Sequence, residues 1–338
     1  MIGALYFEAA VAHHPRTLEL RRRFARLPQI EIERYGELFN RSSQNFRLQK
    51  RRPSLILAEK REGFVLPAPE ICGVGEEAFY FSHLLNCPYD CRYCFLQGMY
   101  RSANYVLFVN YEDFFAAIER KLKERPGRRL TFYSGYDCDS LALEGLTGFA
   151  AAALPFFRGQ ENAVLELRTK AVASRALQGV EAWPGALVAA SLTPPAVAEV
   201  FDHGAPPVAK RVEGLAKLAG KGWPIGLRFD PLIFSDDFRP LYGELFEMVF
   251  AAVPAASVAS VGLGPFRLPS PFYRRLEKLY PDDRALRSAP LEERGGTVSY
   301  SREREQAMVD FCVAELSRYL PAEWIAGLQI GSPGGIAA

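Results

Sequence analysis

Residues 129–157 read RLTFYSGYDCDSLALEGLTGFAAAALPFF, a short apolar run followed by a longer stretch with helical character. The same order, an apolar run and then a helical stretch, occurs six times along the chain. The six units are 79–85 with 111–125, 129–135 with 141–157, 163–169 with 171–179, 186–192 with 206–220, 224–233 with 238–253, and 256–264 with 269–280. Because the apolar runs are continuous rather than alternating, they predict a parallel sheet covered by helices.

Six equal units in series favour a partial (β/α)6 TIM-type barrel over a doubly wound sheet, and they place the active site at the carboxyl ends of the strands. We expect a basic N-terminal lead-in over residues 1–75, the barrel over 76–285, and a C-terminal helical extension with a frayed tail over 286–338. Within the lead-in, residues 16–27 pattern as a basic amphipathic helix with Leu18, Phe24 and Leu27 as its apolar members, and residues 54–58 pattern as a strand. A final helix is expected over 301–320.

The composition is that of an ordinary globular protein, with 49% hydrophobic and 24% charged residues, and it excludes global disorder. No stretch approaches the roughly 18 consecutive apolar residues that a membrane span needs. The N-terminus places its apolar residues before its basic ones, the reverse of a secretory signal. The expected location is the cytoplasm.

Basic residues are concentrated near the N-terminus. Between Arg16 and Arg61 there are thirteen Lys or Arg against five Glu, an excess of eight, although the whole chain carries only +2. The densest part is QKRR at 49–52. A basic segment on a near-neutral body indicates a polyanion such as DNA as partner, and a solvated helix face with basic side chains is the equally weighted alternative.

Three of the six cysteines lie within eight residues, at Cys87, Cys91 and Cys94, in a C-x3-C-x2-C pattern after the first strand. Zinc and cubane iron-sulfur centres normally take four protein ligands, so three thiolates leave one position open for a substrate or cofactor. A zinc site is the alternative, although no fourth Cys or His follows at zinc-ribbon spacing. Cys72 and Cys312 are expected to be buried apolar residues.

This cysteine spacing, followed by an aromatic residue, resembles the cluster motif of the radical S-adenosylmethionine (SAM) superfamily. Within that superfamily, the chain most resembles the spore photoproduct lyase-like family. The matching stretches are NCPYDCRYCFLQGMY at 86–100, FVNYEDFF, ELRTKA, VAASLTPP and residues 208–234. It implies a 4Fe-4S cluster on the three cysteines, with SAM on its fourth iron. Reductive cleavage of SAM would then give a 5′-deoxyadenosyl radical that abstracts hydrogen from substrate, with damaged DNA as a candidate and a flavodoxin or ferredoxin as electron donor.

Carried over by position, Lys170 and Ser191 would bind SAM and Tyr93 would lie beside it. Members of that family also have a hydrogen-donor cysteine on the loop after the second strand and a tyrosine directly after the third cluster cysteine. Here Phe95 occupies the tyrosine's position and has no exchangeable O–H. Tyr136 aligns with the donor cysteine, and Cys138 follows two positions later as a candidate donor.

Two alternatives stay open at this point: a radical SAM enzyme acting on a substrate other than a thymine photoproduct, and a nucleic-acid-binding protein with a structural metal. Arg228 and Asp230, on the fifth strand, are expected either to face the mouth of the barrel or to pair with each other. His83 is expected to be a core residue or one adjoining the site.

Overall fold

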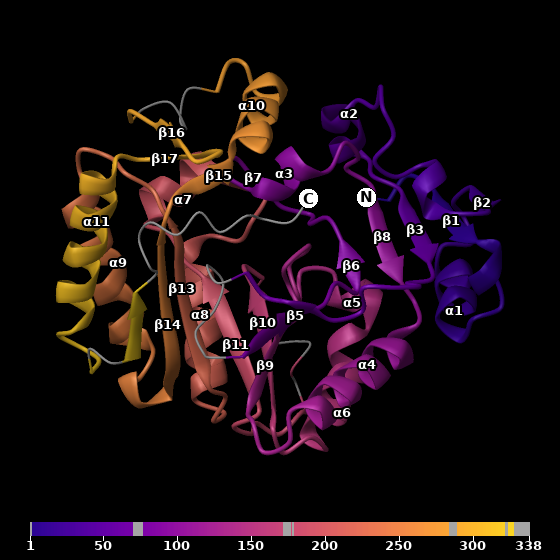
Figure 1. Ribbon diagram of the computed structural model, residues 1–338, viewed down its shortest axis with the longest axis horizontal. Coiled ribbons are helices and arrows are strands. Elements are labelled where there is room, and N and C mark those ends of the chain that lie inside the picture. The colour runs from indigo at the N-terminus through magenta and orange to yellow at the C-terminus, as the bar shows by residue number, and fades with distance from the viewer. Residues whose placement is uncertain are drawn as a thin grey trace.

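An eight-stranded sheet forms the main body of the molecule, and helices cover its outer face (Figure 1). The computed structural model describes residues 2–69, 77–171, 177, 179–283, 289–321 and 324–327. The strand order is β18 (Ile325–Gly327), β14 (Val258–Pro265), β13 (Ile225–Leu232), β11 (Ala186–Ser191), β10 (Ala163–Thr169), β9 (Leu130–Tyr133), β5 (Ala78–Tyr80) and β4 (Leu66–Pro67).

The six strands predicted from the repeated units are the parallel part of this sheet, β5 to β14, so the partial barrel is confirmed. β18 extends it in parallel and β4 pairs with β5 in antiparallel orientation. Most of the helix expected over 171–179 lies outside the described residues. The helices of the barrel and its extension are α4 (Tyr111–Glu124), α5 (Glu144–Thr147), α6 (Phe149–Arg158), α7 (Pro195–Phe201), α8 (Val208–Ala219), α9 (Phe238–Ala252) and α11 (Arg302–Leu316), with a 3-10 turn at Ala255–Ser257.

A second sheet lies beside the barrel and is built mainly from the N-terminal segment (Figure 1). Its order is β2 (Gln29–Ile32), β1 (Leu5–Glu8), β3 (Leu55–Ala58), β8 (Tyr105–Phe108) and β6 (Leu84–Leu85). The strand expected over 54–58 is β3. The expected lead-in of residues 1–75 thus shares a sheet with β8, which comes from the segment expected to be barrel. The single strand expected over 79–85 is divided between the sheets, as β5 and β6.

Three further helices complete this part: α1 (Pro15–Arg23), α2 (Phe46–Arg51) and α3 (Phe95–Met99), with 3-10 turns at Ala9–Val11 and Tyr35–Glu37. Leu18, expected on the apolar face of the first helix, is instead 41% exposed, and Leu20 is the buried leucine there. The helix also ends earlier than the expected residue 27. None of the helices in the described ranges is long and apolar enough to cross a membrane.

Two small sheets lie above the carboxyl ends of the barrel strands (Figure 1). One pairs β7 (Asp90–Cys91) with β12 (Asp202–His203), and the other contains β15 (Arg267–Pro269), β17 (Thr297–Ser299) and β16 (Glu292–Arg294). Helix α10 (Ser270–Leu279) follows β15 and packs on α3. The cysteine segment therefore lies at the end of the barrel where active sites form.

The contact between α3 and α10 depends on Gly98. A Cβ atom at this position would lie 2.4 Å from the Cβ of Phe272 and 2.7 Å from its Cα, so only a residue without a side chain fits. The glycine brings the backbones of the two helices together directly after the cysteine segment.

We expect Gly98→Ala to lower the free energy of unfolding by about 1–3 kcal/mol, the usual cost of overpacking a close contact. Chemical denaturation of the variant measures this. The matched control is Gly145→Ala in α5, where an added Cβ meets nothing within 4 Å. Equal stability of the two variants would contradict the importance of this contact.

Candidate active site

The three clustered cysteines lie on one segment at the mouth of the barrel. Cys91 is buried in β7, while Cys87 and Cys94 are half-buried, and Cys94 caps the N-terminal end of α3. The Cys94 amide donates to the Cys91 carbonyl oxygen at 3.1 Å, which closes a tight turn between the last two cysteines. The segment thus curls so that its three thiols influence one another electrostatically.

Residues from distant parts of the chain hold the backbone of this segment. The Lys50 ammonium donates to the carbonyl oxygens of Cys87 and Tyr89 at 2.6 and 2.7 Å. The Gln97 amide donates to the Cys91 carbonyl oxygen at 2.6 Å, and Gln97 in turn accepts from the Tyr280 hydroxyl at 2.5 Å. The backbone shape of the cysteine segment is therefore set by contacts with α2 and the end of α10.

The three thiols are donor groups of the kind that bind a metal centre. Burial raises the pKa of Cys87 to about 12 and also raises those of Cys91 and Cys94, while Lys170 opposes the shift at the latter two. In the described part of the chain, no three His, Cys, Asp or Glu side chains already stand in the arrangement of a bound ion. The donor set is still that of an iron-sulfur site, since soft thiolates bind iron and lose their protons on doing so.

A buried acid, Asp202, joins the cysteine segment to the barrel. It is only 4% exposed, and its strand β12 pairs with β7 so that Asp202 lies opposite Cys91. Its carboxylate accepts the Tyr93 hydroxyl and, at 2.7 Å, the Arg211 guanidinium. Burial opposes the charge of Asp202, but Lys170 and Arg211 outweigh it and hold its pKa below the usual value.

Lys170 and Ser191, the predicted SAM ligands, lie at or just after the carboxyl ends of β10 and β11. The Lys170 ammonium is 5.4 Å from the centre of the Tyr93 ring. Burial disfavours its charge, but Asp202 and Cys91 more than compensate and raise its pKa. Arg211 also donates to the Ser191 carbonyl oxygen at 3.2 Å, so the Asp202–Arg211 pair contacts the end of β11 and, through Tyr93, the cysteine segment.

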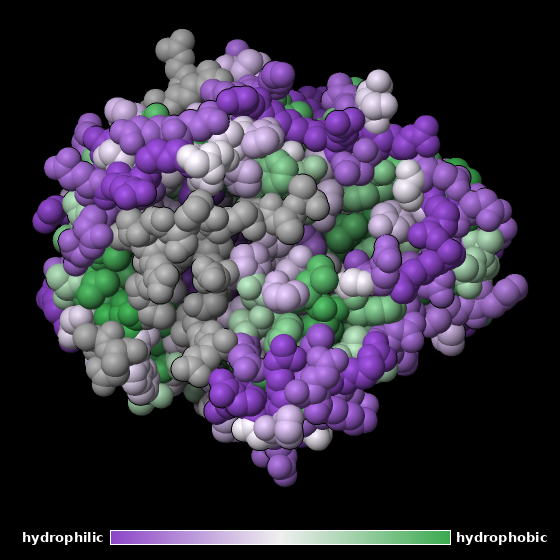
Figure 2. Space-filling view, in the orientation of Figure 1, coloured by the Kyte–Doolittle hydropathy of each residue, from purple (hydrophilic) through white to green (hydrophobic). Residues whose placement is uncertain are grey.

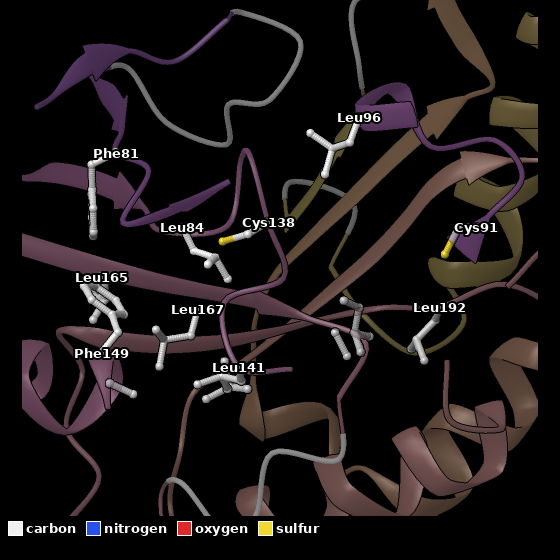
Figure 3. Packing of buried hydrophobic residues seen from close by; sticks show 14 of the residues in the cluster. Phe81, Leu84, Cys91, Leu96, Cys138, Leu141, Phe149, Leu165, Leu167 and Leu192 are labelled. Carbon is white, nitrogen blue, oxygen red and sulfur yellow. The ribbon is translucent and has the colours of Figure 1, made fainter. Parts of the chain in front are cut away.

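The loop after β9 carries Tyr136 and Cys138. The Tyr136 ring lies 5.4 Å from the Phe95 ring and 4.4 Å from the Tyr80 ring, centre to centre, so Tyr136 packs in a tilted arrangement against the residue that follows Cys94. Cys138 is 6% exposed, and Figure 3 shows it among the buried apolar side chains, on a different element from Cys91. Burial raises the pKa of the Cys138 thiol well above the usual value, and the nearby Asp139 and Cys87 add to this shift. Cys138 therefore stays in the S–H form.

The two acids beside Cys138 are part of the fold. Asp139 accepts from the Thr169 hydroxyl and the Lys170 amide, both at 2.6 Å, and thereby fixes the end of β10. Asp137 accepts from Ser82, and burial raises its pKa. The loop that carries Cys138 is therefore tied to the segment just after β5 on one side and to the end of β10 on the other.

Arg228 and Asp230 do not pair with each other, so the expected internal pair is wrong. Arg228 forms a buried ion pair with Glu166 of β10 at 2.6 Å, and Asp230 pairs with Arg267 at 3.0 Å. Glu166 also contacts Arg168 at 2.8 Å. Burial opposes the charge of Glu166, but the two guanidinium groups outweigh it and lower its pKa to about 2.

The inner face of the barrel is thus charged below the mouth. Glu166 and Arg168 alternate along β10 with the buried Leu165 and Leu167, as they must when the strand's other face packs on helices. The buried network also includes Ser260, whose hydroxyl accepts from Arg228 at 2.9 Å. No local pattern in the sequence distinguishes this pair from exposed charges.

Two residues are core, as expected. His83 stacks on Phe149 with ring centres 3.8 Å apart, and burial lowers its pKa to about 3. Cys312 in α11 is fully buried. Cys72 lies outside the described residues.

The model of the family described as "Spore photoproduct lyase" matches residues 78–304, about two thirds of the chain, which includes every residue of the site just described except Lys50. The chain belongs to the spore photoproduct lyase family. It is therefore a radical SAM enzyme of the lyase type. The match extends from β5 to the start of α11, which is the barrel together with the cysteine segment.

Two curated spore photoproduct lyases resemble the chain in sequence. The protein of Bacillus subtilis (strain 168) is 25% identical over 244 residues, covering 70% of this chain and 71% of the relative. That of Geobacillus sp. (strain Y412MC61) is 24% identical over 198 residues, 58% of each.

Solved structures of spore photoproduct lyase share the fold over nearly the full length. A double mutant with bound AdoMet and dinucleoside spore photoproduct superposes with a TM-score of 0.83 at 19% identity, covering 98% of this chain and 99% of the other. A complex with dinucleoside spore photoproduct gives a TM-score of 0.81 at 18% identity, with 97% and 98% covered. The second sheet formed by the N-terminal segment therefore lies within the fold shared with spore photoproduct lyase.

Proposed function

We propose that the chain binds a 4Fe-4S cluster through Cys87, Cys91 and Cys94, and binds SAM through Lys170, Ser191 and Tyr93. The observation that carries the proposal is that three mutually interacting thiols lie together with the half-buried Lys170 ammonium, which is 5.4 Å from the centre of the Tyr93 ring, at the carboxyl ends of the barrel strands. When bound, the cluster and SAM would supply a 5′-deoxyadenosyl radical for hydrogen abstraction from substrate.

The protein's own residues have distinct tasks in this proposal. The Lys170 ammonium is suited to meet a carboxylate, and Ser191 offers a hydroxyl on the neighbouring strand. Asp202 orients Tyr93 and keeps Lys170 charged through its own negative charge. Cys138 retains its S–H hydrogen, the form from which a hydrogen atom can be donated.

We propose damaged DNA, with a thymine photoproduct as the lesion, as the substrate. A solved spore photoproduct lyase binds the dinucleoside spore photoproduct, which supports this substrate class. The basic N-terminal segment would contact the DNA, and a small electron carrier such as a flavodoxin or ferredoxin would supply the electron. A cytoplasmic location fits this role. Phe95 is the residue that favours the second candidate, a radical SAM reaction on a different substrate, because it lacks a hydroxyl.

Anaerobic reconstitution tests the proposal. We expect a brown protein with an absorbance band at about 400 nm that releases 5′-deoxyadenosine from SAM under reduction. Bound zinc without SAM cleavage would overturn the assignment.

An assay on DNA containing the spore photoproduct, run beside undamaged DNA and a Phe95→Tyr variant, then separates the substrates. Restored thymines support photoproduct repair. SAM cleavage without repair by either protein supports the second candidate.

A further inference from the structure

Three short helices from distant parts of the sequence meet above the cysteine segment. α3 packs on α10 through Gly98, and α2 is joined to the end of α3 because the Gln49 side chain accepts from the Ser102 hydroxyl at 3.1 Å and the Ala103 amide at 2.9 Å. Figure 1 shows α2 and α10 on the same edge of the molecule as α3, and Figure 2 shows hydrophilic residues along that edge. The three helices form one surface.

An arginine on or next to each of the three helices α2, α3 and α10 lies on this surface. Arg47 on α2 and Arg101 just after α3 are exposed, and Arg275 on α10 is half-buried. Arg101 is close enough to Arg275 to add to the lowering of its pKa by burial. The Arg47 guanidinium lies 5.3 Å from the centre of the Tyr280 ring.

Within the ranges that the structure describes, none of the three arginines forms an ion pair with an acid. Positive charges held close together without a counter-charge are destabilising until an anion binds between them. We call Arg47, Arg101 and Arg275 the arginine rim.

Other basic residues of the N-terminal segment are used inside the fold. Arg16 pairs with Glu112 at 2.8 Å, Arg21 donates to Gln29, and Arg23 donates to the carbonyl oxygen of Gly145. Lys50 points to the cysteine segment. Of the arginine rim, only Arg47 belongs to the basic N-terminal segment. Arg101 and Arg275 come from later parts of the sequence.

We propose that the arginine rim binds the phosphodiester backbone of the nucleic-acid strand that carries the substrate. Guanidinium groups bind phosphate oxygens in a bidentate manner, and several of them along one edge suit a repeating chain of phosphates. The rim is fixed relative to the cysteine segment, because Tyr280 beside Arg47 bonds Gln97 and Asp90, and α2 supplies Lys50. A strand held there would lie at the edge of the barrel mouth.

This inference rests on the proposed function for the identity of the substrate strand, but its test uses undamaged DNA. The variant is the triple change Arg47→Gln, Arg101→Gln and Arg275→Gln in the cluster-loaded protein. The control is the triple change Arg120→Gln, Arg239→Gln and Arg302→Gln, which removes the same charge from exposed positions outside the basic N-terminal segment. Binding of a labelled oligonucleotide is measured by fluorescence anisotropy over a series of salt concentrations.

For the parent protein and the control, we expect the same steep fall of affinity with salt. In the rim variant the slope of log K against log[salt] should be shallower by about 2 to 3, at roughly 0.7–0.9 per lost phosphate contact. A triple Arg→Lys variant of the rim should restore most of the slope, which separates loss of charge from loss of folding. An unchanged slope in the Gln variant, or equal loss in the control, would overturn the proposal.

The same variants distinguish other partners. If the Gln rim variant binds DNA normally but loses affinity for an acidic electron-carrier protein, the rim is a protein-docking surface and the proposal is wrong. DNA binding that depends on the rim, together with absence of photoproduct repair, would leave the rim in place and overturn the proposed substrate instead.

Discussion

We expect the replacement of Cys94 by alanine to abolish assembly of the iron-sulfur cluster. The change leaves two thiols where three are needed, and Cys138 lies on a different loop with its own contact to the Ser134 carbonyl oxygen. We expect the variant to bind no stoichiometric iron or sulfide after anaerobic reconstitution and to lack the absorbance band at about 400 nm. Iron and sulfide analysis per chain provides the measurement.

The matched control for this experiment is Cys138→Ala. It removes a buried thiol of the same mouth, but one that we do not assign to the cluster, so iron content should match that of the parent. Full iron in Cys94→Ala, or loss of iron in Cys138→Ala, would show that the cluster ligands are wrongly assigned.

Asp202→Ala should lower both stability and SAM affinity. The Asp202 and Arg211 side chains are 1% and 2% exposed, so the change leaves a guanidinium charge buried without its acid. Removing one partner of a buried ion pair costs about 3–5 kcal/mol. Tyr93 loses its hydrogen-bond acceptor and Lys170 loses the negative charge that raises its pKa. We expect the Kd for SAM to rise at least about tenfold, equivalent to about 1.4 kcal/mol.

Chemical denaturation and equilibrium binding of SAM to the cluster-loaded protein measure the two effects. The control is Glu213→Ala, which removes an acid from the exposed pairs with Lys210 and Lys217 and should leave stability and SAM affinity nearly unchanged. A variant lacking both Asp202 and Arg211 should be less destabilised than the sum of the single changes, because neither charge is left alone. If the destabilisations of the two single variants simply add in the double variant, Asp202 and Arg211 do not interact as an ion pair.

The barrel was predictable because its strands and helices alternate along the chain. Each unit has a continuous apolar run and a helical stretch, and neighbouring units in sequence are neighbouring strands in space from β9 to β14. The second sheet was not predictable in this way. Its strands β1, β3 and β8 are separated by helices and long loops, and the pairing of β3 with β8 joins residues about fifty positions apart.

The cysteine positions were predictable from spacing, but the groups around them were not. Asp202 bonds Tyr93, a residue more than a hundred positions earlier, and nothing in its own neighbourhood identifies it as buried. Glu166 and Arg228 likewise look like ordinary charges on apolar strands. Such long-range pairs are visible only when the strands that carry them are placed side by side.

The hydrogen bonds of Lys50 and Gln97 have a consequence for the order of events during maturation. Residues on both sides of the cysteine segment in the sequence contribute to holding it, Lys50 from before the barrel and Tyr280 from the last barrel unit. We therefore expect the hydrogen bonds that hold this segment to form only once the chain has been synthesised as far as Tyr280. We therefore expect iron and sulfide to enter a protein that is already folded, unlike the zinc of a zinc finger, which is needed for folding itself.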